Sequence, residues 1–270
     1  MTDPALQAQI DAASAYEQFF VPALFQEWPE RVVASANLQA GQRLLDVACG
    51  TGVLTRELAR RAGSQGRVAG LDINPGMLTV ARRLVPGVEF REGSADALPF
   101  ADQSFDLVTC QFGLMFFADR AKALREMLRV LAPGGRVVAV VWDSLDNTPA
   151  YAAEVRLLQR LAGDRAAEAL RAPFVLGDRR VLAQLFEGVG LKSPVIETHQ
   201  GTARFPSIRA IVEADLRGWL PIWGVTLTEE KIREILAAAD RELKPYVTTG
   251  GGITFASPAH IVSAMKAQTQ

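Results

Sequence analysis

Short apolar runs alternate with amphipathic stretches along the first half of the chain. Nearly continuous apolar runs such as Leu44–Ala48 and Val137–Val141 are typical of strands that are covered on both faces of a parallel sheet. Between such runs, Val53–Ala62 and Pro75–Leu84 carry apolar residues at helical spacing. This alternation predicts an α/β fold with a Rossmann-like, doubly wound parallel sheet.

The pattern gives bounds for the elements of both halves. The predicted strands are Arg43–Ala48, Arg67–Asp72, Val88–Glu92, Phe105–Gln111 and Arg136–Trp142. Arg120–Leu131 is a third predicted helix of this half, in addition to the two helices named above. Beyond Trp142 the predicted helices are Pro149–Leu161, Asp178–Val189, Ser207–Leu220 and Thr228–Leu243. Val195–Phe205 alternates like one strand, and we interpret Gly252–Ala256 and His260–Met265 as pieces of a terminal antiparallel strand.

A glycine turn follows the first predicted strand. Gly50 and Gly52 allow positive φ angles and a close approach of the backbone to a ligand, and the helix that follows directs its first amides at the turn. Asp72 ends the next strand, about 20 residues after Gly52, where an acidic residue can bind two ribose hydroxyls. The sequence therefore predicts a nucleoside site at this turn.

Asp46 distinguishes two kinds of nucleoside cofactor. A dinucleotide turn reads G-x-G-x-x-G and holds a pyrophosphate, but Leu54 and Thr55 stand where its third glycine would fall. A carboxylate beside the turn repels a diphosphate and attracts an ammonium group. The pocket is therefore predicted to prefer an amino acid nucleoside such as S-adenosylmethionine to NAD.

Five ordered blocks of sequence carry a resemblance to a known family. They are Leu44–Gly52, Gly70–Leu78, Gly93–Phe100, Phe105–Val108 and Glu126–Gly135. Through them the chain resembles class I S-adenosylmethionine-dependent methyltransferases of the small-molecule branch, the methyltransferase type 11 family, similar to ubiquinone and menaquinone C-methyltransferases. The likeness runs from about Tyr16 to Met265 and is strongest through Val141.

The resemblance implies a fold, a division of the chain and an activity. It implies a seven-stranded sheet of order 3-2-1-4-5-7-6 whose last two strands are separated by a helical cap insertion. We expect residues 1–40 to form a helical segment that closes the site and 41–145 to form the S-adenosylmethionine-binding core. Residues 146–270 would complete the sheet and carry an acceptor-side cap at about 206–250. The implied enzyme transfers a methyl group to a small, largely apolar acceptor of phenolic, quinone-like or natural-product type.

The same resemblance and the ends of the strands suggest the cofactor-binding residues. They are Asp46, Ala48, Cys49, Gly50 and Gly52 for the methionine part, Asp72 for the ribose, Ile73 and Met77 for the adenine face, Ser94, Ala95 and Asp96 for the adenine edge, and Gln111 and Phe112 near the ammonium and the sulfur. Ser94 stands where family members often have an aspartate. The adenine amino contact is therefore left open between Ser94, Asp96 and neither of them.

No residue is assigned as a catalytic base. The two histidines, His199 and His260, lie outside the family blocks, and the segment Gln111–Phe117 contains no histidine or acid. An acidic phenol or enol suits such a site because it needs little help to lose its proton. No metal is required for methyl transfer from a sulfonium.

Net charge and cysteine content limit the kinds of partner and the cellular compartment that we expect. The net charge of −1 gives no electrostatic footprint for nucleic acid, so a small-molecule acceptor is expected. Cys49 and Cys110 are too few for a disulfide framework, no apolar segment is long enough to span a membrane, and a cytoplasmic location is expected. The sequence leaves open whether the chain forms a homodimer. A nicotinamide-dependent oxidoreductase and a non-catalytic, cofactor-binding regulatory subunit are the alternatives.

Overall fold

Strands and helices alternate through the first half of the chain, in the order that the apolar runs predict. The computed structural model describes residues 3–268. The elements of this half are α1 (Pro4–Phe20), η1 (Val21–Phe25), α2 (Pro29–Ala36), β1 (Arg43–Val47), α3 (Val53–Ala62), β2 (Arg67–Asp72), α4 (Pro75–Leu84), β3 (Glu89–Glu92), β4 (Phe105–Gln111), η2 (Leu114–Phe116), α5 (Arg120–Val130) and β5 (Leu131–Trp142). The bounds of α3, β2, α4 and β4 are the predicted ones.

The second half of the chain is mainly helical. Its elements are η3 (Leu145–Asn147), α6 (Pro149–Ala162), α7 (Asp164–Arg171), η4 (Ala172–Phe174), α8 (Arg179–Glu187), β6 (Val195–His199), β7 (Thr202–Phe205), α9 (Ile208–Ala214), η5 (Asp215–Trp219), α10 (Leu220–Ile222), α11 (Glu229–Glu242), η6 (Lys244–Tyr246), β8 (Ile253–Ala256) and β9 (Ala259–Met265). Of the helices described, none combines the length and the apolar character that crossing a membrane demands.

Side-chain caps explain why two of the helices begin where they do. The Asn74 side chain precedes α4 and accepts hydrogen bonds from the backbone N–H groups of Gly76 and Met77. Pro75 occupies the first helical position, where a backbone donor is not needed. Asp119 caps α5 in the same manner. Because these signals are local, the sequence suffices to place both helix starts.

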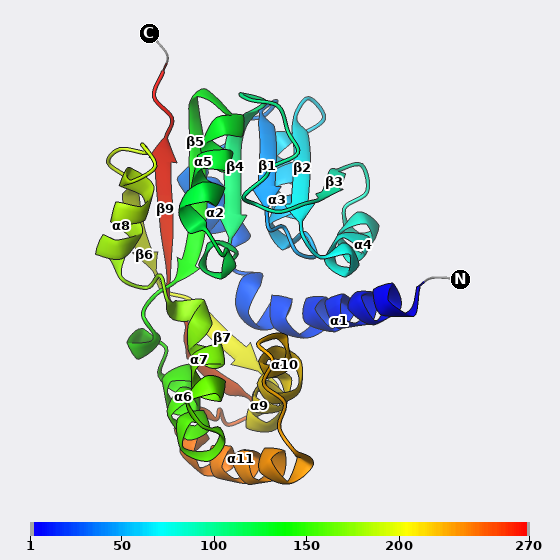
Figure 1. The fold of residues 1–270 in the computed structure, drawn as a ribbon, viewed down its shortest axis with the longest axis vertical. Coiled ribbons are helices and arrows are strands. Elements are labelled where there is room, and N and C mark those ends of the chain that lie inside the picture. The colour runs from blue at the N-terminus through cyan, green and yellow to red at the C-terminus, as the bar shows by residue number, and fades with distance from the viewer. Residues whose placement is uncertain (1–2, 269–270) are drawn as a thin grey trace. The chain divides into compact units, whose positions relative to one another are not determined.

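The main sheet has the predicted strand order. Within the described residues, seven strands pair in the order β3-β2-β1-β4-β5-β9-β6, which confirms the order 3-2-1-4-5-7-6. β1 pairs in parallel with β2 and β4, and β4 pairs in parallel with β5. Gly134 and Gly135 near the start of β5 exchange backbone hydrogen bonds with Lys266, just beyond the end of β9. β9 therefore runs antiparallel to β5, as the arrows in Figure 1 show.

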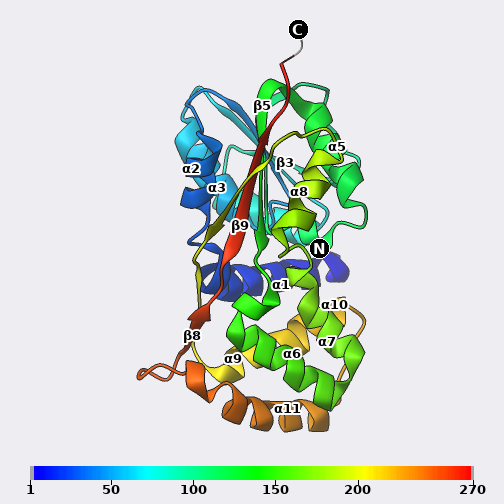
Figure 2. The same cartoon turned by 90° about the vertical axis from the view of Figure 1, so that its left-hand side faces the viewer.

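Helices cover both faces of this sheet. Figure 2 shows α2 and α3 on one face and α5 and α8 on the other, so the sheet is doubly wound. The central strands are accordingly apolar, and Leu44, Leu45 and the run Val137–Val141 are completely buried. Figure 1 shows α1 passing across the edge at which β1, β2 and β4 end. Ligands bind at this edge in open α/β sheets.

The chain divides into two compact units. The first contains residues up to 141, 179–198 and from 260 onward, and the second contains 142–178 and 199–259. The second unit holds α6, α7, α9 and α11 together with a two-stranded sheet in which β7 and β8 pair antiparallel. The predicted division by role, with boundaries at residues 40 and 145, remains a prediction.

Two strand assignments near the end of the chain are wrong. The single strand predicted over Val195–Phe205 is two strands, of which β6 joins the main sheet and β7 lies in the second unit. The break occurs at Gly201, whose carbonyl accepts a hydrogen bond from Ser257 N. β8 was predicted as part of a terminal strand of the main sheet, but it pairs with β7. Alternation of polar and apolar residues identifies a strand without identifying its partner.

The second unit buries two interacting carboxyl groups. Glu154 on α6 and Asp215, at the start of the π-helical turn η5, are 1% and 3% exposed. In the part of the chain that the structure describes, no group hydrogen-bonds to either carboxyl oxygen of Glu154 or to Asp215 Oδ2. Burial raises the pKa of Asp215 to about 8 and the pKa of Glu154 well above its usual value, and Asp215 raises that of Glu154 further. The folded unit therefore favours protonated carboxyls.

We expect the second unit to become less stable as the pH rises from about 4 to about 8. Over this window the folded state still binds protons that the unfolded chain has released, so the free energy of unfolding falls with pH. Asp215→Asn removes one of the two titrations while keeping the side chain's shape. Its urea midpoint should exceed that of the unmodified protein at pH 8 and should change less between pH 5 and pH 8.

Asp240→Asn is the matched control, because Asp240 is an exposed carboxylate on α11 of the same unit. It should follow the unmodified protein at every pH. The same loss of stability with pH in Asp215→Asn as in the unmodified protein would contradict the assignment.

Candidate functional site

β1 ends in a turn that is built from left-handed residues. Ala48, Gly50 and Gly52 have φ angles of +56°, +55° and +88°. Glycine adopts such angles without steric cost, whereas Ala48 is held in this conformation by its surroundings. Gly52 is also the N-cap of α3. The turn therefore joins the carboxyl end of β1 to the positive end of the α3 dipole.

The neighbouring strand β4 ends in a similar way. Phe112 directly follows β4 with a φ of +55°, and its N–H donates to Val140 O in β5. Gly113 lets the two turns approach, since a Cβ at this position would lie 2.6 Å from the Cβ of Ala48. Sparsely populated backbone conformations at adjacent strand ends are a feature of functional edges.

A cavity of the first unit lies at these two turns. Its lining comes from β1 and its turn, the start of α3, the end of β4 and the N-terminal helical segment. The lining residues are Tyr16, Phe25, Asp46, Ala48, Cys49, Gly50, Thr51, Val53, Leu54 and Gln111. The structure thus brings together five of the predicted cofactor-binding residues, namely Asp46, Ala48, Cys49, Gly50 and Gln111.

Asp46 is the buried acid of the cavity. Its Oδ2 accepts a hydrogen bond of 2.6 Å from the Thr55 hydroxyl, and its Oδ1 accepts one of 3.1 Å from the Thr109 hydroxyl. Burial raises the pKa of Asp46 to about 7, although the two hydroxyl groups oppose this rise. The charge of Asp46 therefore changes near neutral pH, and a cation in the cavity would favour its ionised form.

Asp72 connects the ends of two strands. Its Oδ2 accepts a hydrogen bond of 2.8 Å from Gly50 N in the turn after β1, and its Oδ1 accepts one of 2.9 Å from Asn74 N. Burial raises the pKa of this carboxyl, and the hydrogen bonds from Asn74 and Gly50 oppose the rise. Each oxygen keeps acceptor capacity for a ligand hydroxyl. One carboxylate can therefore fix the turn and bind a ligand.

Gln111 brings an amide group to the cavity from the end of β4. Its Oε1 is buried and accepts no hydrogen bond from the residues between 3 and 268. A buried acceptor without a partner is costly, so this oxygen favours a ligand that donates. The ring of the next residue, Phe112, packs instead against Phe25 and Trp28, with ring centroids 5.4 and 5.6 Å apart.

Cys49 contributes its backbone to the turn and its side chain to the core. The thiol lies in an apolar cluster with Leu78, Ala81, Val85 and Phe90. Burial raises the pKa of the thiol well above its usual value. The thiol is therefore not a nucleophile at neutral pH.

The two residues predicted for the adenine face have different surroundings. Ile73 is 70% exposed. Met77 is partly buried and packs against a cluster of Ile10, Ala13 and Val80 that joins α1 to α4. Met77 therefore has a packing role between these helices, and its predicted contact with the ligand stays a prediction, as does that of Ile73.

The loop after β3 carries three further predicted residues, Ser94, Ala95 and Asp96. The loop begins beside the end of β2, because Gly93 N donates to the last carbonyl of that strand at 3.0 Å. Ala95 is buried, whereas Asp96 lies at the surface, 3.4 Å from Lys122 Nζ. A hydrogen bond from Ser94 lowers the pKa of Asp96, and Lys122 adds to this effect. Their roles toward adenine stay predictions.

A polar clasp, made of Glu17, Thr51 and Arg56, connects α1 to the glycine turn and α3. Glu17 accepts a hydrogen bond of 2.5 Å from the Thr51 hydroxyl and forms an ion pair of 3.0 Å with Arg56. The preceding residue, Tyr16, lines the cavity, and burial together with the charges of Asp72 and Glu17 raises its pKa. Sequence reasoning missed these residues, because Glu17 and Thr51 are 34 positions apart. No local spacing connects them.

α1 also packs closely against the start of α4. Gly76 makes this possible, since a Cβ at this position would lie 2.4 Å from the backbone carbonyl carbon of Gln9. The apolar cluster of Ile10, Ala13 and Val80 lies at the same contact. Because later turns of α1 carry the clasp and one wall of the cavity, the α1–α4 contact determines where that wall stands.

The histidines lie elsewhere. His260 in β9 is buried, with Nδ1 2.9 Å from the hydroxyl of Thr198, and His199 ends β6. Neither lines the cavity. Nowhere among the described residues do three or more His, Cys, Asp or Glu side chains gather in a way that could hold a metal ion. The titratable side chains that do line the cavity are Tyr16, Asp46 and Cys49.

Known proteins share the sequence around this cavity. The model of the ubiE/COQ5 methyltransferase family matches residues 18–154, about half of the chain. A 2-phytyl-1,4-naphtoquinone methyltransferase of Thermosynechococcus vestitus is 47% identical over 116 residues, which are 42% of this chain and 52% of that protein. The ubiquinone/menaquinone biosynthesis C-methyltransferase UbiE of Xanthomonas campestris is 46% identical over 119 residues, 42% of this chain and 47% of that protein. The chain thus spans about half the length of these curated relatives.

Solved structures share the fold. The YcgJ protein of Bacillus subtilis aligns with a TM-score of 0.58 at 19% identity, over 90% of this chain and 99% of that one. Phosphoethanolamine N-methyltransferase 2 of Haemonchus contortus, solved with S-adenosyl-L-methionine, aligns with a TM-score of 0.59 at 17% identity, over 95% of this chain and 57% of that one. At these identities the likeness concerns the fold alone.

We expect Gly76→Ala to loosen the N-terminal segment. Alanine favours the helix α4 more than glycine does, so any loss of stability must come from the clash with the backbone of α1. Overpacking of this kind costs about 1–3 kcal/mol. Amide hydrogen exchange of α1 should speed up, and limited proteolysis should cut the segment earlier. Gly218→Ala is the control, since a Cβ there meets no atom within 4 Å. If the hydrogen exchange of α1 were unchanged in Gly76→Ala, the close contact between α1 and α4 would not determine how firmly α1 is held.

Proposed function

The chain belongs to the ubiE/COQ5 methyltransferase family, and from this membership we propose that it is an S-adenosylmethionine-dependent methyltransferase. We further propose that its acceptor is a small, largely apolar molecule of phenolic, quinone-like or natural-product type. The names of two relatives, a 2-phytyl-1,4-naphtoquinone methyltransferase and a ubiquinone/menaquinone biosynthesis C-methyltransferase, support this class of acceptor. Because the match covers only about half of the length of those relatives, the whole activity is part of the proposal.

The acceptor atoms in the cavity support this cofactor. Asp46 and the side-chain oxygen of Gln111 both lie in the lining, and the latter has no hydrogen-bond donor among the described residues. An ammonium group offers three N–H donors and a positive charge, which suit these acceptors. A diphosphate would place negative charge beside Asp46 and offers no donor to Gln111. The pairing of these two acceptors is the observation that carries the proposal.

We assign roles to the chain's residues within this proposal. Asp46, Ala48, Cys49, Gly50 and Gly52 would frame the methionine part, Asp72 the ribose hydroxyls, Ile73 and Met77 the adenine face, Ser94, Ala95 and Asp96 the adenine edge, and Gln111 and Phe112 the region near the reacting group. Tyr16 and Phe25 join this set as walls of the cavity.

The protein's part in the chemistry is to bind, orient and exclude water. When bound, the cofactor supplies a methyl group on a sulfonium, which already has a good leaving group. Orientation within a water-poor cavity then provides most of the acceleration that the protein can add. The titratable groups of the cavity lining are a carboxyl, a thiol and a phenol whose pKa values are all raised by burial. An acceptor that is itself acidic, such as a phenol or enol, fits this surrounding.

Two alternatives make different predictions about binding and turnover. A nicotinamide-dependent oxidoreductase would bind NADH at the glycine turn, and a non-catalytic regulatory subunit would bind S-adenosylmethionine without transferring its methyl group. Incubation with methyl-labelled cofactor and phenolic or quinone acceptors separates the enzyme from the regulatory subunit.

We also propose a small-molecule partner and a reducing compartment. Near-neutral net charge supports a small acceptor in preference to nucleic acid. Cys49 and Cys110 are buried, unpaired thiols, and this supports the cytoplasm.

S-adenosylhomocysteine should raise the thermal midpoint of the protein, whereas NADH should leave it unchanged, because a ligand that binds only the folded state stabilises it. In Asp72→Ala the stabilisation by S-adenosylhomocysteine should shrink, with a loss of about 1–2 kcal/mol in binding free energy, since a charge-assisted hydrogen bond is lost. Differential scanning fluorimetry and calorimetry measure both effects. Stabilisation by NADH and not by S-adenosylhomocysteine would reverse the proposal.

The affinity for S-adenosylhomocysteine should rise between pH 6 and pH 8. The pKa of Asp46 is about 7, so the carboxyl is mostly neutral at pH 6 and mostly ionised at pH 8, and only the ionised form pairs with an ammonium group. Asp46→Asn should flatten this dependence. Isothermal titration calorimetry in buffers of different ionisation enthalpy measures both the affinity and the proton that Asp46 releases on binding. An affinity that falls with pH would refute the pairing.

A further inference from the structure

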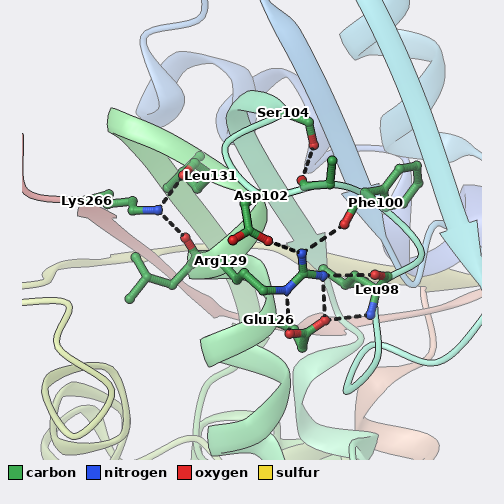
Figure 3. Close-up of polar contacts among 10 residues, drawn as sticks. Leu98, Phe100, Asp102, Ser104, Glu126, Arg129, Leu131 and Lys266 are labelled. Carbon is green, nitrogen blue, oxygen red and sulfur yellow. Dashed lines mark hydrogen bonds and ion pairs between the residues drawn. The ribbon is translucent and has the colours of Figure 1, made fainter.

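Two side chains of α5 hold the loop that follows β3. Glu126 Oε2 accepts a hydrogen bond of 2.8 Å from Leu98 N, and Arg129 Nη2 donates one of 3.0 Å to Leu98 O. Leu98 itself is buried. Figure 3 shows both polar groups of this residue turned toward the two side chains. The contacts that fix Leu98 to α5 are therefore made by its backbone and do not depend on the identity of its side chain.

Arg129 uses every N–H donor of its guanidinium. Nε and Nη2 form a fork on Glu126 with distances of 2.7 and 2.8 Å. The remaining donors reach Leu98 O, Phe100 O at 2.9 Å and Asp102 Oδ1 at 2.7 Å. The loop is thus folded around one planar cation (Figure 3). Lysine has the charge but not the planar set of five donors, so it cannot replace these contacts.

The helix that bears these side chains is itself anchored. Lys266, which follows β9, donates from Nζ to Leu128 O at 2.8 Å and to Leu131 O at 2.6 Å. These carbonyls lie at the end of α5, where helical backbone acceptors lack partners of their own. Figure 3 shows this contact beside the Arg129 network. The end of α5, the helix that holds the loop, is therefore hydrogen-bonded to the residue that follows β9 of the main sheet.

The segment held between two anchors is the one predicted to meet adenine. Gly93 N donates to Asp72 O at one end, and Leu98 binds α5 at the other. Ser94, Ala95 and Asp96 lie between them. Pre-arranged binding groups need not be ordered by the ligand, and this increases affinity.

We propose that Glu126 and Arg129 are positioning residues for recognition of the adenine ring. This inference rests on the proposed function, since it needs S-adenosylmethionine as the cofactor. The pair does not touch the ligand in this account. It fixes the loop that carries Ser94, Ala95 and Asp96, the residues proposed above for the adenine edge.

The chain contains a matched pair for comparison. Arg60 and Glu57 on α3 form the same fork three residues apart, with distances of 2.8 Å from Nε and 2.6 Å from Nη2. The Arg60 side chain is 60% exposed, and the further partner of Glu57 is Arg61 on the same helix. Arg60→Lys is therefore the same chemical change at a place that should not matter.

The experiment compares two ligands in each variant. S-adenosylhomocysteine presents an amino donor and a ring acceptor at the adenine edge, and S-inosylhomocysteine presents an acceptor and a donor instead. In Arg129→Lys the affinity for S-adenosylhomocysteine should fall by about tenfold, and the preference over S-inosylhomocysteine should shrink toward one. Arg60→Lys should keep the affinity and the preference of the unmodified protein.

Several outcomes would overturn the proposal, and they differ from failure of the proposed function. If the unmodified protein does not bind S-adenosylhomocysteine, the function fails. If it binds and Arg129→Lys keeps the full preference for adenine, the positioning role fails. Equal losses for both ligands would show a general structural role and would also refute it. If Arg129→Lys does not fold, as judged by circular dichroism, the near-isosteric Glu126→Gln takes its place with the same expected results.

Discussion

One aspartate at the end of β2 connects three segments of the candidate site. The side chain of Asp72 accepts the amide of Gly50 in the turn after β1, and its backbone carbonyl accepts the amide of Gly93 in the loop after β3. Asp46 makes a comparable link between β1 and β4 through the hydroxyl of Thr109. The strand ends are therefore held together by polar groups of the candidate site, of which Asp46 lines the cavity. Parallel pairing brings these ends to one edge, and these hydrogen bonds help to fix the turns that leave it.

Much of the first unit could be predicted because its signals are local. The Asn74-Pro75 pair marks the start of α4, and the mainly apolar run between Arg67 and Asp72 predicts the bounds of β2. In the second half such signals are sparser. The prediction omitted α7, and it joined β6 to β7 and assigned β8 to the wrong sheet. Pairing between strands that are distant in sequence depends on packing, which polar and apolar alternation does not encode.

The candidate site divides along the same line. The glycine turn, Asp46 and Gln111 could be found because motifs and strand ends mark them, and the structure brings them to one cavity. Tyr16 and Glu17 could not be found, since Glu17 bonds to Thr51, 34 positions away, and Tyr16 lies in the cavity lining beside residues 46–54 and 111, which are distant in sequence. The hydroxyls of Thr55 and Thr109 were also missed, although Thr55 lies one turn beyond the N-cap of α3. A buried carboxyl predicted from sequence should prompt a search for hydroxyl donors in the next helical turn.

The return of β9 to the sheet has a consequence for biosynthesis. Lys266 bonds to Leu128, 138 positions earlier, and β9 is the neighbour of β5 in the sheet. During translation the edge of β5 therefore stays bare while the whole second unit emerges from the ribosome. Bare strand edges are places where growing chains associate with one another. Between synthesis of residue 142 and residue 265 the nascent chain accordingly exposes a strand edge that β9 covers in the finished fold.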